Sequence, residues 1–130
     1  LPLPGALAFA GVPVRDVEVV SPAQVFAEKL HALTRSYGIE NSRVRDLADL
    51  MLVVEDGLRP DAFLLRTVRI VFDARASHPL PDDVPEPPGS WTQTYATIAA
   101  DLDITARSVP DAIHVLRQYW RTVLAAEKER

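Results

Sequence analysis

The sequence predicts an α+β fold that is mostly α, with one or more short N-terminal strands followed by about five helices in bundle-like packing. Three observations lead to it. A chain of 130 residues that is 48% hydrophobic and 25% charged can build one domain around its own core. Residues 12–20 are rich in β-branched side chains, which favours a strand. Helix start signals precede apolar repeats at helical spacing in much of the remaining chain. We expect a single domain over residues 1–130.

Composition excludes several classes of protein. The chain has no cysteine, which rules out disulfide scaffolds, cysteine nucleophiles and thiolate metal sites. A net charge of -4 disfavours a protein whose main task is to coat nucleic acid. No apolar run approaches the roughly 18 residues that a membrane span needs, so we expect a cytoplasmic protein without a membrane partner. Because residue 1 is Leu and no signal peptide is recognisable, we expect a piece of a longer protein.

The first helix is predicted to begin at Ser21 and to run to about Tyr37. Ser21 is a good N-cap residue, the proline after it suits the first helical position, and Gln24 completes a capping box. Gly38 comes directly after the last helical residue, where glycine commonly ends a helix.

Two more helices are expected before residue 77. The second spans 43–56 and stops at Gly57. The third begins near Pro60-Asp61 and ends around Ala76. Its centre, residues 67–72, is rich in β-formers, which leaves a strand as an alternative there.

Residues 78–90 hold five of the eleven prolines and predict a stiff, extended connector. A fourth helix is expected after it, and a fifth from Ser108. The stripe of the fourth helix is Trp91, Tyr95, Ile98 and Leu102, and that of the fifth is Ile113, Leu116, Trp120, Val123 and Leu124.

Lys29 breaks the pattern of its helix. On a helical wheel it falls inside the apolar arc, between Val25 and Leu33. Its long side chain could run along the apolar surface to water. Alternatively, its ammonium could be aimed into a cleft at an anion such as phosphate. His31 falls on the polar face, so we expect it at the surface and find little support for a histidine metal site.

The second helix carries a similar anomaly. Arg43 sits within its buried stripe, and Asp46 lies on the flank of that stripe. Asp49 is explained by an exposed pair with Arg45, four residues before it. Joined by a short link, the first two helices should pack as an antiparallel pair. We therefore expect Lys29, Arg43 and Asp46 to approach one cleft.

Metal ligands are not convincingly present. Asp16 and Glu18 share a strand face, as metal-binding carboxylates do, but a solvent face has the same pattern. Gly89-Ser90 followed by Asp101 and Asp103 fits the signature of polymerase-β-like nucleotidyltransferases. The unbroken helical stripe between them would point the two aspartates about 200° apart. We therefore assign no metal ligand in this chain.

Two runs resemble the AbiEii/AbiGii toxin family of nucleotidyltransferases. Residues 21–35 contain its Ala-Glu-Lys-Leu-x-Ala pattern, and residues 41–50 contain Ser-Arg-x-Arg-Asp-x-x-Asp-Leu, with Arg45 where the family usually has Lys. The family's Gly-Ser or Gly-Gly and Asp-x-Asp strand is absent, so the chain resembles the C-terminal, helical portion of such a toxin. Later matches are Phe72, Arg75, Leu80-Pro81, Pro87-Pro88, Trp91 and Tyr95.

The resemblance implies nucleotidyl transfer from a nucleoside triphosphate, with Mg²⁺ held by carboxylates of the complete protein. It also implies a cognate antitoxin, a role in phage defence and, in some members, tRNA as the acceptor. By similarity, Lys29 and Asp46 are catalytic: Lys29 contacts the triphosphate and Asp46 acts as base or positioner. Arg43, Arg45 and Asp49 would bind substrate. Lacking the metal-binding region, this chain alone should be inactive.

A second hypothesis gives the same residues a structural role and no part in catalysis. In it, the chain is a helical interaction module, and Lys29, Arg43 and Asp46 form a buried network that only stabilises the fold.

Overall fold

The computed structural model describes residues 21–35, 43–76 and 78–129, and five α-helices account for most of them. No strand occurs in these ranges, so the mostly helical prediction is confirmed, whereas the strand expected over 12–20 lies outside the described residues. Short 3-10 turns at Gly89–Trp91 and Ala126–Glu129 flank the last two helices. The helices are α1 (Pro22–Arg35), α2 (Arg43–Glu55), α3 (Ala62–Arg75), α4 (Thr92–Asp101) and α5 (Val109–Ala125).

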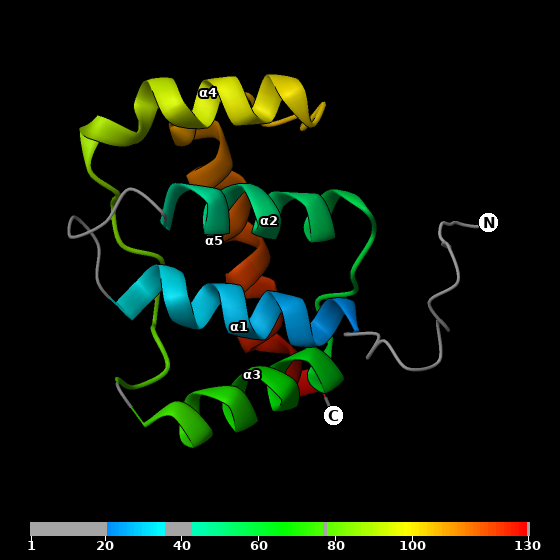
Figure 1. The fold of residues 1–130 in the computed structure, drawn as a ribbon. Helices are drawn as coiled ribbons and strands as arrows, with labels where there is room; N and C mark the ends of the chain where they lie inside the picture. Colours follow the sequence, from blue (N-terminus) through cyan, green and yellow to red (C-terminus); the bar gives the residue numbers. More distant parts are fainter. Residues whose placement is uncertain (1–20, 36–42, 77, 130) are drawn as a thin grey trace, which may run out of the picture.

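Four of the helices lie in a row, and the fifth crosses it (Figure 1). The spatial order is α4, α2, α1, α3, and each helix contacts its neighbour in the row. The first two helices, α1 and α2, run antiparallel, as expected for a helical hairpin. Helix α5 passes behind the row and contacts α2, α3 and α4. The bundle is therefore two layers thick, with α1 and α2 at its centre.

Helix ends match the capping residues of the sequence. The Ser21 hydroxyl accepts from the backbone N–H of Gln24 (3.1 Å), and the Asp61 carboxylate accepts from that of Leu64 (3.0 Å). The Gln24 side chain itself donates to Glu28 (3.0 Å). Gly57, with φ +100°, ends the turn after α2 in the left-handed region that glycine adopts without strain.

The third helix is continuous from Ala62 to Arg75. The strand alternative over 67–72 is therefore wrong. Burial of Val68, Val71 and Phe72 against the rest of the bundle outweighs the β-propensity of this stretch.

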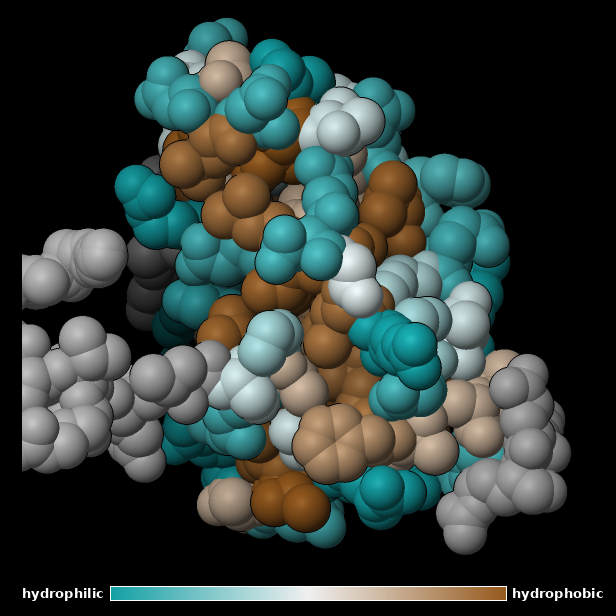
Figure 2. Space-filling view, turned by 90° about the vertical axis from the view of Figure 1, so that its right-hand side faces the viewer, coloured by the Kyte–Doolittle hydropathy of each residue, from teal (hydrophilic) through white to brown (hydrophobic). Residues whose placement is uncertain are grey.

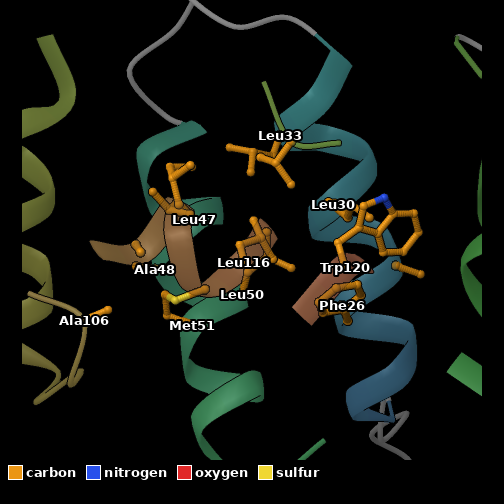
Figure 3. Packing of buried hydrophobic residues seen from close by; sticks show 14 of the residues in the cluster. Phe26, Leu30, Leu33, Leu47, Ala48, Leu50, Met51, Ala106, Leu116 and Trp120 are labelled. Carbon is orange, nitrogen blue, oxygen red and sulfur yellow. The ribbon is translucent and has the colours of Figure 1, made fainter. Parts of the chain in front are cut away.

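The core lies where α5 crosses α1 and α2 (Figure 3). Phe26 of α1 packs against the rings of Tyr119 and Trp120 of α5, with centroids 5.3 Å and 6.4 Å away. Leu30 of α1 and Leu47 of α2 are fully buried in the same cluster. Truncating such a leucine to alanine typically costs about 2–5 kcal/mol. This core holds the α1–α2 hairpin in one geometry.

The stripe of α4 differs at its end from the prediction. Trp91 and Tyr95 are buried as expected, but Leu102 is 42% exposed. The reason is that the helix stops at Asp101, so Leu102 no longer continues the helical stripe. The next turn inserts Ile104 into the core instead.

The proline-rich segment 78–90 is extended up to Pro88, as predicted (Figure 1). It joins the outer helix α3 to the opposite outer helix α4, and its middle rests on α5. The Trp120 indole donates to the carbonyl of Pro81 (2.9 Å), and the Arg117 guanidinium donates to that of Val84 (2.8 Å). Val84 is itself buried, so the connector is part of the packed structure.

The side of the row where α1 begins and α2 ends exposes apolar surface. Figure 2 shows a band of hydrophobic residues between polar ones on this face. A hollow of about 360 Å³ opens there, between the start of α1 and the link from α2 to α3. Its apolar lining includes Ala23, Val53, Leu58 and Leu64. None of the five site residues expected from the sequence lines it.

Candidate functional site

Lys29 and Asp46 meet across the α1–α2 interface. The Lys29 ammonium lies 3.3 Å from Oδ1 of Asp46, although the two residues are 17 positions apart in sequence. The antiparallel packing of the hairpin brings them together, and their predicted proximity is confirmed. The expected cleft around them stays a prediction.

Asp46 is the buried centre of the site. Its side chain is 9% exposed, and each of its oxygens has a cationic partner. Oδ1 faces Lys29, and Oδ2 accepts from Nη1 of Arg43 at 3.1 Å. Arg43 therefore joins the site, as predicted. A buried carboxylate needs such partners, because an unpaired charge away from water is costly.

Asp49 contacts the same lysine from the next turn of α2. Its Oδ2 lies 3.1 Å from the Lys29 ammonium. The expected pair between Asp49 and Arg45 is wrong: within the described chain, Arg45 is exposed and Asp49 pairs across the helix interface instead. Residues three apart on a helix share a face, and this spacing of Asp46 and Asp49 was the available signal.

Among the described residues, the site brings together two cations, Lys29 and Arg43, and two carboxylates, Asp46 and Asp49. Partial burial lowers the pKa of Lys29, but the hydrogen bond and charge of Asp49, followed by those of Asp46, outweigh it and raise that pKa above its usual value. The ammonium is therefore charged at neutral pH. Its side chain is 36% exposed, so solvent or a ligand can reach it.

A second polar group lies on the other side of α1, next to α3. Glu28 accepts from the guanidinium of Arg75 on α3 at 2.6 Å and from Gln24 on its own helix at 3.0 Å. The hydrogen bond from Arg75 lowers the pKa of Glu28, against an opposing effect of burial. This pair ties α1 to α3 on the side away from α2.

His31 is buried, with 5% of its surface exposed, so the expected surface position is wrong. Phe72 of α3 packs edge-on against its ring, with centroids 5.0 Å apart, and His78 covers it from the connector. A helical wheel of α1 contains neither neighbour. Sequence reasoning missed this cluster because Phe72 and His78 both lie more than 40 residues after His31.

The described residues offer no obvious metal centre. No group of three or more His, Cys, Asp or Glu side chains in this part of the chain could hold an ion. Asp101 ends α4, whereas Asp103 has a left-handed backbone and pairs with Arg107 at 2.9 Å. Asp16 and Glu18 lie outside the described residues. In the same described ranges, no helix has the length and apolar character needed to cross a membrane.

The chain was compared with known proteins and protein families. No curated protein and no solved structure matches it. One family model does match, that of the nucleotidyl transferase AbiEii toxin of type IV toxin–antitoxin systems, over residues 1–126. This match covers nearly the whole chain, including every residue of the Lys29–Asp46 site. The chain therefore belongs to the AbiEii family of nucleotidyl transferase toxins.

Proposed function

We propose that this chain is the helical, nucleotide-contacting part of a toxin that transfers a nucleotide from a nucleoside triphosphate to an acceptor, with tRNA as that acceptor. The carrying observation is the Lys29 ammonium, which is charged, held between two helices and partly open to solvent. A point charge in this setting is suited to binding phosphate oxygens. Family membership supports the reaction class.

The reaction places two demands on the protein. The acceptor hydroxyl loses its proton and bonds to the α-phosphorus, while the bond to the leaving pyrophosphate breaks. Catalysis of such transfers rests on positioning and on neutralising charge that develops on the phosphates. We assign the neutralising role to Lys29, supported by Arg43 and with Arg45 as a further contact to substrate.

Asp46 suits positioning better than general-base catalysis. Both of its oxygens contact cations, at 3.3 Å and 3.1 Å. An oxygen that is to accept a proton must first leave its partner. The geometry therefore favours a role in which Asp46 holds Lys29 and Arg43 in place.

Magnesium is expected for the family's reaction, but the described residues do not fit it. The Asp46 carboxylate is occupied by its two cations, and Asp49 is paired with Lys29. We therefore assign no metal-binding role to these side chains. We expect the metal ligands among residues other than these. An antitoxin partner is supported by the toxin–antitoxin family, and we place the pair in phage defence in the cytoplasm, where tRNA and nucleotides occur.

The decisive experiment compares three variants of the complete natural protein. Lys29→Met removes the charge but keeps an unbranched side chain, and Lys29→Arg keeps the charge. Arg59→Met, at an exposed position, is the charge-matched control. We expect Lys29→Met to reduce transfer of labelled nucleotide roughly 100-fold or more, with its unfolding midpoint close to that of the parent. Lys29→Arg should retain part of the activity.

The interaction-module hypothesis makes the opposite prediction. If the network only stabilises the fold, Lys29→Met will lower the free energy of unfolding while the folded fraction keeps full transfer activity. That result would reject the proposed role of Lys29.

A further inference from the structure

Two carboxylates from successive turns of α2 form salt bridges with one ammonium of α1. Asp46 Oδ1 is 3.3 Å and Asp49 Oδ2 is 3.1 Å from Lys29 Nζ. An ammonium has three N–H donors. The hydrogen bond to Asp46 uses one of them, the ion pair with Asp49 holds the ammonium from a second side chain, and a further N–H remains for another acceptor.

The two carboxylates differ in their surroundings. Asp46 is 9% exposed and also binds Arg43, so it serves two cations. Asp49 is 30% exposed, and within the described chain its carboxylate contacts Lys29 alone. Its contribution to the site is therefore made through the lysine.

We propose that Asp49 is a positioning residue, which together with Asp46 fixes the direction of the remaining N–H of Lys29 toward a phosphate of the nucleotide. This inference rests on the proposed function. A lysine side chain has four rotatable bonds and is expensive in entropy to order. One carboxylate leaves the ammonium free to swing about a single contact, whereas two from successive turns define its position.

This positioning role takes the place of the direct substrate binding by Asp49 that the family resemblance implied. A carboxylate facing the triphosphate directly would repel it. Bound to Lys29, the same charge is neutralised by the ammonium and keeps that ammonium ready for a phosphate oxygen.

The direction in which Asp49→Asn changes nucleotide affinity tests the positioning role. Asp49→Asn removes a negative charge near the phosphate site, so charge alone predicts tighter binding of nucleotide. Loss of positioning predicts weaker binding. We expect Asp49→Asn in the complete protein to weaken affinity for a nucleoside triphosphate and to lower the transfer rate, each by about three- to tenfold. Asp49→Glu, which keeps the charge, should recover part of both.

Two controls separate positioning from a general effect. Asp73→Asn removes the same charge from an exposed position on α3 and should change neither quantity. In a Lys29→Met background, Asp49→Asn should have no further effect on nucleotide affinity, because the group it positions is gone.

The outcomes distinguish the inference from the proposed function. Tighter nucleotide binding by Asp49→Asn, or an equal loss in the Lys29→Met background, overturns the positioning role. Parental affinity and rate in Asp49→Asn, with Lys29→Met inactive, reject the role of Asp49 alone. An active Lys29→Met protein rejects the proposed function itself.

Discussion

The imidazole rings of His31 and His78 lie with their centroids 4.8 Å apart, one on α1 and the other at the start of the proline-rich connector. Phe72 of α3 packs edge-on against both rings. Nε2 of His78 is also 2.8 Å from the hydroxyl of Thr34. This cluster fastens the connector to two helices through side chains that can gain a proton as the pH falls.

We predict that stability falls as the pH drops below about 6.5, the ordinary pKa of histidine. Burial lowers the pKa of both rings. The charges of His78, Arg35 and Arg75 add to this at His31, and Arg35 adds to it at His78. The unfolded chain therefore binds protons more readily, so the contribution is complete above this pH and lost below it. Urea unfolding between about pH 8 and pH 5 measures the slope.

His31→Gln/His78→Gln should flatten that slope, whereas His114→Gln, at an exposed position, should leave it unchanged. An equal slope in the double variant would contradict the assignment.

Glu55 should stabilise the loop between α4 and α5. Its carboxylate accepts from the backbone N–H groups of Thr105 (2.8 Å) and Ala106 (3.1 Å). Glu55→Ala leaves both donors without this partner and should lower the free energy of unfolding by about 1–2 kcal/mol. Asp56→Asn, at the neighbouring exposed position, should change it little. Equal losses from the two substitutions would mean that the two hydrogen bonds contribute nothing specific.

Substitution of Asp46 should lower the free energy of unfolding more than substitution of Asp49. Asp46→Ala removes the buried carboxylate that contacts both Lys29 and Arg43 and should cost about 2–3 kcal/mol. Asp49→Ala breaks a more exposed pair and should cost less than about 1 kcal/mol. Chemical denaturation of both variants gives the comparison. The reverse order would show that Asp49, not Asp46, anchors the lysine.

The 130-residue chain on its own should not transfer nucleotide. Phosphoryl and nucleotidyl transfer depend on charge neutralisation that metal ions largely supply, and the described residues offer no cluster to hold one. The measurement is incubation of the purified chain with labelled nucleoside triphosphates, Mg²⁺ and total tRNA, beside the complete protein. Transfer at a comparable rate would place the metal ligands within this chain.

The sequence predicted that Lys29 and Asp46 lie close together because each residue breaks the apolar pattern of its own helix, and a short link makes the two helices antiparallel neighbours. It failed for His31, because the side chains that bury this residue come from α3 and the connector. It failed for the partner of Asp49 because an i,i+4 pattern along one helix competes with a contact across two helices. Local periodicity was enough to predict the helices, whereas the neighbours of His31 and Asp49 depend on packing between distant parts of the chain.

The spatial order of the row also sets a length limit on the chain. Helices α3 and α4 occupy opposite edges, so the connector between them must span three helix-to-helix spacings, or about 24–30 Å at roughly 8–10 Å each. The 13 residues between the end of α3 and the 3-10 turn before α4, 76–88, reach about 43 Å when fully extended. Removing more than about four of them would leave too little chain to keep α4 against α2, whereas insertions between the exposed residues Pro85 and Glu86 would be tolerated.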